Sequence, residues 1–213
     1  MDGTLIDSEP YWIDAEMALA ERFGATWTYG DALTLVGSPL DVSAEILQAA
    51  GIELPIEAII EDLLSSVTAR ARAHLPWMDD ARSLLESLHD AGIPCALVTM
   101  SRGAFVDAFL DAAGEFFDVV VTGDQVSRGK PDPEAYLLAA LRLGVNAVDC
   151  VAIEDSAAGV RSAHASAART IGVIRHVDVP QIDGIARVTS LHGVTVDDVR
   201  AFARGELPLS LAD

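Results

Sequence analysis

From Pro76 onward the sequence alternates short apolar runs with longer amphipathic stretches. The apolar runs are typical of buried strands and cover residues 94–99, 119–121, 150–154 and 170–174. Helical periodicity occupies the stretches between and around them, over residues 79–91, 102–113, 133–144, 156–168 and 196–204. Short apolar strands that alternate with helices form parallel sheets with helices on both faces. The sequence therefore predicts an α/β protein with a doubly wound parallel sheet.

The segment before Pro76 has a different pattern. No strand pattern interrupts residues 11–75, and helices are expected over residues 10–23, 30–36, 39–50 and 55–74, several of them stopped by glycine. We therefore expect an all-helical cap domain at residues 11–75, inserted into a core domain made of residues 1–10 and 76–213. Between Phe23 and Ala69 this cap has no Lys, Arg or His, although it has several acidic residues.

The polar residues of interest stand where the predicted strands end. Thr99 ends one apolar run and Glu154-Asp155 ends another, while Lys130 lies in a loop that leads into a helix. The stretch Asp2-Gly3-Thr4 suits a tight turn, because glycine adopts backbone conformations closed to other residues. The carboxyl ends of parallel strands meet at one edge of the sheet, where such folds bind their ligands. We therefore expect these side chains to converge there.

In this order and spacing, the motifs around Asp2, Thr99, Lys130 and Asp155 resemble those of the haloacid dehalogenase superfamily of phosphatases, in the branch close to beta-phosphoglucomutase. The family's first motif reads Asp-x-Asp-Gly-Thr/Val at the end of a strand, and its first Asp is the nucleophile. Met1 stands at the x position. The resemblance therefore implies that the nucleophile and its strand lie directly before Met1. It places that strand mid-sheet, between the strands that end at Thr99 and Asp155, so we expect the 213-residue form to fold poorly and to be inactive.

The resemblance also implies a role for each matching residue. Asp155 is a metal ligand, and Glu154 supports the metal site. Asp2 gives its backbone carbonyl to the metal, and its side chain acts as general acid and base. Thr99 hydrogen-bonds the phosphoryl oxygens, and Lys130 neutralises charge beside them. Further contacts to phosphate or substrate are expected from Gly3, Thr4, Met100, Ser101, Gly37 and Ser38. For Gly37 and Ser38 a simple interhelical turn is an equal alternative.

A cluster of carboxylates at this edge requires a cation. Asp2, Glu154, Asp155 and the missing nucleophile would stand within a few ångströms of one another. Each like-charged pair 4 Å apart repels by roughly 4 kcal/mol at an effective dielectric constant of 20. An all-oxygen site beside phosphate favours Mg²⁺, so we expect this cofactor.

The charge balance limits the partners. A net charge of −19 argues against nucleic acids and anionic membrane surfaces, so an anionic substrate needs local positive charge. Lys130 is the one lysine in a chain that otherwise uses arginine, which is consistent with a need for a compact point charge. No apolar stretch reaches the roughly 20 residues of a membrane span, and no signal peptide leads the sequence. The two cysteines, Cys95 and Cys150, are expected to be reduced thiols in buried strands, so we expect a cytoplasmic protein. We also expect a monomer.

The sequence leaves three functions open. We favour a Mg²⁺-dependent phosphatase that hydrolyses a small phosphate monoester, such as a sugar phosphate, through an aspartyl-phosphate intermediate. A phosphosugar mutase is the alternative, although a mutase must hold a second phosphate and the acidic cap offers it little positive charge. A non-catalytic phosphate-binding protein is the third, if the chain truly begins at Met1.

Overall fold

The computed structural model describes residues 1–208 and 211. It divides into two compact units, and we describe each by itself. The first unit comprises residues 1–6, 77–102 and 113–213, and the second comprises residues 7–76 and 103–112. The contacts thus group residues 7–10, 76 and 103–112 with the helical unit, whereas the sequence pattern assigned them to the core. The division into a core and an inserted cap stays a prediction.

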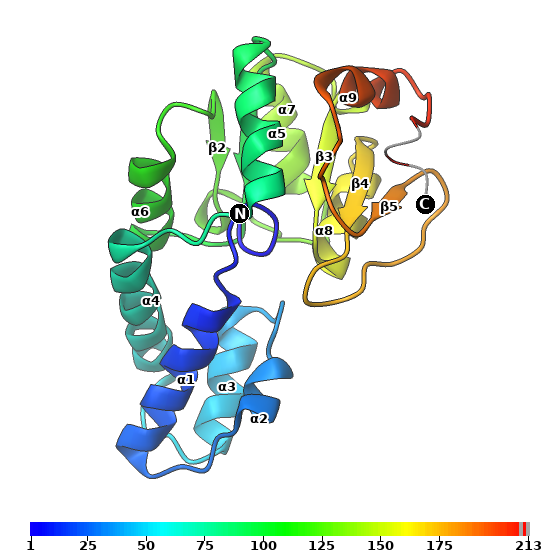
Figure 1. The fold of residues 1–213 in the computed structure, drawn as a ribbon. Helices are drawn as coiled ribbons and strands as arrows, with labels where there is room; N and C mark the ends of the chain where they lie inside the picture. The colour runs from blue at the N-terminus through cyan, green and yellow to red at the C-terminus, as the bar shows by residue number, and fades with distance from the viewer. Residues whose placement is uncertain (209–210, 212–213) are drawn as a thin grey trace. The chain divides into compact units, whose positions relative to one another are not determined.

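The strands of the first unit are all parallel. β1 (Ala96–Val98) pairs with β2 (Val119–Val121), and β3 (Val151–Glu154) pairs with β4 (Arg169–Val173), which pairs with β5 (Ala186–Val188). Figure 1 shows the three strands β3, β4 and β5 side by side. The predicted α/β class is confirmed. The sequence pattern predicted one sheet, however, whereas within the described residues β1 and β3 belong to separate sheets.

Helices cover both faces of these strands. Helices α5 (Asp79–Asp90) and α9 (Val196–Ala203) pack against alternate strand residues in one apolar core, which includes Leu84, Ile153, Ile171, Val188 and Phe202. The intervening strand residues pack against α7 (Glu134–Leu143) and α8 (Ala157–Ala165) in two further clusters, which include Val98, Ala139, Ala152 and Ala163. Successive residues of a strand point to opposite faces, so this distribution of contacts is that of a doubly wound core.

Two kinds of element were not predicted. Short 3₁₀ helices, η1 (Gly123–Gln125) and η2 (Ala147–Asp149), lie before α7 and β3. Strand β5 was also missed, because Arg187 at its centre interrupts the apolar pattern that marked the other strands. Its pairing with β4, in the register Ile171 to Ala186, makes this segment a strand, although its composition does not indicate one.

The second unit is helical, as predicted for the cap. It contains α1 (Glu9–Phe23), α2 (Tyr29–Leu33), α3 (Leu40–Ala49), α4 (Ile56–Ala73) and most of α6 (Ala104–Ala113). The Arg70 guanidinium lies over the ring of Tyr11, 4.3 Å from its centroid, and joins α4 to α1. Trp12 meets Phe105 edge to face at 5.7 Å and joins α6 to the same helix.

An apolar cavity of about 450 Å³ lies in the first unit, between the two sheets' strands. Residues 96–98 of β1 and 151–153 of β3 line it, and α5, α7 and α9 contribute apolar side chains. Met1, Thr4 and Leu5 line it as well. Across the described part of the chain, no helix combines the length and apolar character needed to cross a membrane.

Candidate active site

The first six residues form a tight loop against the end of β3. The Met1 carbonyl accepts hydrogen bonds from the amides of Leu5 (2.8 Å) and Ile6 (3.2 Å), and the Gly3 amide donates back to the Ile6 carbonyl (2.9 Å). Gly3 has φ of +68°, a conformation that favours glycine. A Cβ at this position would lie 1.9 Å from Oδ2 of Asp155. Glycine is therefore required both for the turn and for the space that the Asp155 carboxylate occupies.

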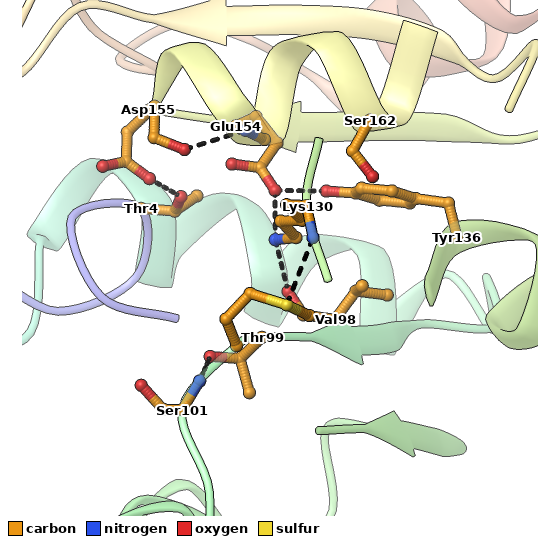
Figure 2. Close-up of polar contacts among 12 residues, drawn as sticks. Thr4, Val98, Thr99, Ser101, Lys130, Tyr136, Glu154, Asp155 and Ser162 are labelled. Carbon is orange, nitrogen blue, oxygen red and sulfur yellow. Dashed lines mark hydrogen bonds and ion pairs between the residues drawn. The ribbon is translucent and has the colours of Figure 1, made fainter. Parts of the chain in front are cut away.

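Asp155, directly after β3, presents a desolvated carboxylate. The Thr4 hydroxyl donates a hydrogen bond to its Oδ1, as Figure 2 shows. Burial raises the pKa of Asp155 to about 6, and the negative charge of Glu154 adds to the effect, while Thr4 opposes it. Such a carboxylate gains from a nearby cation, because a cation offsets both the lost hydration and the repulsion.

Glu154, the last residue of β3, is the acceptor for two donors. The Lys130 ammonium and the Tyr136 hydroxyl both bind its Oε1, and the ammonium also donates to the Val98 carbonyl at 3.0 Å. Figure 2 shows these groups meeting at the Glu154 carboxylate. Burial pushes the pKa of Glu154 up, but Lys130 and Tyr136 outweigh it, so the pKa lies below its ordinary value. Glu154 is therefore an ionised, buried carboxylate that holds the lysine.

Asp2 is hydrogen-bonded to the loop that follows β1. The Thr99 hydroxyl oxygen accepts a hydrogen bond from the Ser101 amide at 3.1 Å, and the Ser101 hydroxyl donates to Oδ2 of Asp2 at 2.7 Å. The backbone amide of Lys130 reaches the sulfur of Met100 at 3.4 Å. The first loop is thus tied to β1 through Asp2 and to β3 through Thr4.

The structure brings together most of the residues predicted for the site. One continuous set of contacts in the first unit links Asp2, Gly3, Thr4, Thr99, Met100, Ser101, Lys130, Glu154 and Asp155. Gly37 and Ser38 belong to the second unit. There they form the turn between α2 and α3, with Gly37 at φ of +76° and the Ser38 amide bonded to the Leu35 carbonyl at 2.8 Å. Their contact with substrate stays a prediction.

The fit of a divalent cation depends on which carboxylates are engaged. Within the described residues, no group of three or more His, Cys, Asp or Glu side chains is arranged to hold a metal ion. Glu154 is held by Lys130 and Tyr136, and the Asp2 side chain by Ser101. Asp155, which is half-buried and accepts a hydrogen bond from the Thr4 hydroxyl, is the third carboxylate of the site, and its chemistry suits a hard cation. The fit is therefore partial, since Asp155 needs further oxygen ligands from backbone or from another carboxylate.

Sequence reasoning missed two residues of this site. Tyr136 lies on α7 and bonds Glu154. Gly159 lies on α8, where a Cβ would come within 1.8 Å of Oε2 of Glu154. Nothing in the sequence marks Tyr136, because its direction depends on how α7 packs. Gly159 did carry a signal, since a glycine inside a helix often permits a close approach.

Comparison with known proteins identifies a family. Residues 1–173 match the haloacid dehalogenase-like hydrolase family. Hexitol phosphatase A of Escherichia coli is 34% identical over 199 residues, which cover 92% of this chain and 91% of that protein. Phosphorylated carbohydrates phosphatase of Thermotoga maritima is 33% identical, with 84% of each chain covered. The resemblance that the motifs indicated is thereby confirmed.

A solved structure shares the fold over nearly its full length. It is that of CbbY from Rhodobacter sphaeroides in complex with phosphate, with a TM-score of 0.81 and 25% sequence identity. The likeness covers 93% of this chain and 96% of that one. A shared fold supports the architecture, whereas the chemistry has to be argued from the site itself.

Proposed function

Because the chain belongs to the haloacid dehalogenase-like hydrolase family, we propose that it is a Mg²⁺-dependent phosphatase of a small phosphate monoester, most simply a sugar phosphate. The family and the relatives' names support hydrolase activity of the sugar phosphatase or phosphomutase-like kind. Phosphatase is the finer proposal. It rests above all on one observation, the joining of Asp2, Thr99, Lys130 and Asp155 by contacts at the carboxyl ends of β1 and β3.

The chemistry is proposed to pass through an aspartyl-phosphate. An Asp on a strand directly before Met1 would attack phosphorus, while Asp2 protonates the leaving alcohol and then activates the water that hydrolyses the intermediate. The Ser101 hydroxyl, bonded to Oδ2 of Asp2 at 2.7 Å, fixes this acid. Thr99 and the Lys130 ammonium would stabilise the charge on the transferred phosphoryl oxygens.

The apolar cavity supports the position of that strand. Residues of both β1 and β3 line it, and within the described residues β1 pairs only with β2 and β3 only with β4. Each strand therefore has one edge without a strand partner, and unpaired buried backbone groups cost about 1–3 kcal/mol each. An apolar strand between them would pair both edges and would deliver its last residue beside Met1, Lys130 and Asp155.

Mg²⁺ is proposed as the cofactor. Asp155 and the backbone carbonyl of Asp2 would hold it, together with the nucleophile's carboxylate. When bound, the ion supplies positive charge that offsets the carboxylates and the phosphoryl group. Glu154 supports the arrangement indirectly, because it holds Lys130 in place.

A mutase is the alternative, and the composition of the helical unit weighs against it. No Lys, Arg or His stands between Phe23 and Ala69 to hold a second phosphate. A non-catalytic phosphate-binding protein is the further alternative for the chain as numbered, since its described carboxylates do not form a complete metal site. Cytoplasmic location and a monomeric state stay predictions.

The test uses an engineered extended form. In it, about five β-branched apolar residues, the usual strand length, are followed by Asp and fused directly before Met1. Release of inorganic phosphate from a panel of sugar phosphates is measured with Mg²⁺ and with a chelator present. We expect Mg²⁺-dependent hydrolysis. Conversion of one phosphosugar into another without release of phosphate would favour the mutase, and binding without turnover would favour the non-catalytic alternative.

A further inference from the structure

Tyr136 touches both charged partners of the buried ion pair. Its hydroxyl donates to Oε1 of Glu154, the oxygen that Lys130 also binds. The Lys130 ammonium lies over its ring, 5.3 Å from the centroid, within the range of a cation–π contact. We infer that Tyr136 is a positioning residue for Lys130 and Glu154, and this inference rests on the proposed function only for its catalytic consequence.

The ring of Tyr136 is anchored on both halves of the core. It packs against the cluster around Val98 and Ala139, and also against the cluster around Ala152 and Ala163. The first cluster contains β1 and the second contains β3. Tyr136 therefore keeps a fixed position relative to both strands, and the hydrogen bond from its hydroxyl fixes the orientation of the Glu154 carboxylate.

A purely space-filling role does not account for the hydroxyl. Burial of a hydroxyl is unfavourable unless it forms a hydrogen bond, and phenylalanine would fill the same volume without that requirement. Burial and the charge of Glu154 raise the pKa of Tyr136 well above its ordinary value, so the group stays a donor. It donates to a carboxylate that already has a cationic partner, which points to orientation of the carboxylate as its task.

The orientation matters because of how Lys130 uses its donors. An ammonium has three N–H donors. Within the described part of the chain, Val98 and Glu154 accept from it, and we assign the third donor to a phosphoryl oxygen. The direction of this third donor depends on where Glu154 is held. If Tyr136 loses its hydroxyl, Glu154 keeps its charge but loses the bond that fixes Oε1, and the ammonium is free to reorient.

The single lysine of the chain allows a direct measurement. Protein labelled with [¹⁵N]lysine gives one side-chain ammonium signal, which belongs to Lys130, so its proton exchange with water can be followed by NMR. Tyr136→Phe keeps the ring and removes the hydroxyl. Tyr11→Phe is the matched control, because it also removes one tyrosine hydrogen bond, to the His74 carbonyl at 3.0 Å in the helical unit.

We expect slow ammonium exchange in the unsubstituted chain and in Tyr11→Phe, and exchange faster by about tenfold or more in Tyr136→Phe, the scale of a hydrogen bond to a charged group. Unchanged exchange in Tyr136→Phe would overturn the inference. If this variant does not fold, a hydroxyl proton resonance of Tyr136 with a cross-peak to the Lys130 ammonium in the unsubstituted chain takes its place. Its absence would equally overturn the inference.

The catalytic consequence is tested separately in the extended form. There Tyr136→Phe is expected to lower kcat about tenfold with KM changed less than about twofold, since the lost contact acts in the transition state. Normal kcat together with faster exchange would mean that the positioning has no catalytic effect and would overturn that part. If the unsubstituted extended form hydrolyses no phosphate monoester, the proposed function fails, while the ammonium measurement still decides the positioning role.

Discussion

Lys130 and Glu154 form an ion pair that is almost completely buried, with side chains that are 10% and 5% exposed. Pairs of this kind are costly to break, because removal of one partner leaves an uncompensated charge in the interior. The pair joins the loop before α7 to the end of β3, and the Val98 carbonyl extends it to the end of β1. A lysine so placed has the geometry of a fixed point charge at the edge of both strands.

The first prediction concerns the shape of this charge. In the extended form, Lys130→Arg should lower kcat nearly as much as Lys130→Ala, by about 10²-fold, the usual scale for loss of one transition-state donor. Arginine keeps the charge, but its planar fork cannot take the place of a compact ammonium between Val98 and Glu154. Arg128→Ala, at an exposed position two residues away, is the control and should be near normal. An arginine variant with near-normal kcat would contradict the assigned role.

The second prediction concerns the substrate. For sugars of similar size, monophosphates should show a higher kcat/KM than bisphosphates. The second phosphate of a bisphosphate needs positive partners, and residues 24–68 contain none. Steady-state kinetics on matched pairs, each the same sugar with one or two phosphates, would measure this. A clear preference for the bisphosphates would remove the argument against a mutase.

The third prediction concerns the pH dependence of stability in the helical unit. Glu16 is buried, and the indole N–H of Trp27 donates to it at 3.3 Å. Burial raises the pKa of Glu16 from 4.5 to about 7, although the Trp27 bond opposes the shift. A raised pKa means that the folded state favours the protonated form. The stability that Glu16 contributes is therefore complete below about pH 4.5 and is lost as the pH rises through about 7.

Glu16→Gln tests this sign directly. Glutamine keeps an acceptor for Trp27 and cannot ionise. At pH 8 the variant should be more stable than the unsubstituted chain by about 2 kcal/mol, which is less than the full shift would give because water still reaches part of the carboxylate. Near pH 5 the difference should largely vanish. Chemical denaturation at both pH values measures it, with exposed Glu21→Gln on the same helix as the control. A variant that is less stable at pH 8 would show the sign to be wrong.

The alternation of apolar runs and helices predicted the fold class because both signals are local. The runs that became β1 to β4 are mostly apolar, whereas β5, with Arg187 at its centre, owes its existence to pairing with β4. The assignment of residues 103–112 to the helical unit could not be predicted from the sequence either. It depends on contacts such as that between Trp12 and Phe105, which join residues far apart in the sequence.

The candidate site was predictable where it follows the strands. Thr99 and Asp155 each follow a strand, and parallel strands bring their carboxyl ends to one edge, so their convergence with Lys130 followed from the fold class. Tyr136 was not predictable, because its role depends on the rotation of α7 about its own axis. The different hydrogen-bond partners of the two carboxylates, Glu154 and Asp155, were not predictable either. Composition gives Glu154 and Asp155 the same chemistry, and only the structure shows one bonded to Lys130 and the other to Thr4.

The central claim is that a strand ending in a nucleophilic Asp belongs between β1 and β3. Three forms separate its structural part from its chemical part: the chain as numbered, the extended form ending in Asp, and a matched extension ending in Asn. Both extensions should unfold cooperatively and at a higher temperature than the chain as numbered, because a strand in the cavity pairs the edges of β1 and β3.

The most direct measurement is the turnover of an aryl phosphate with Mg²⁺ by these three forms. The account predicts hydrolysis by the Asp extension alone, with none from the Asn extension or from the chain as numbered. All three share Asp2, Thr99, Lys130 and Asp155, and the two extensions differ from each other only in the attacking carboxylate. Full activity from the chain as numbered, or equal activity from the Asp and Asn extensions, would show that another group attacks phosphorus and would contradict the mechanism.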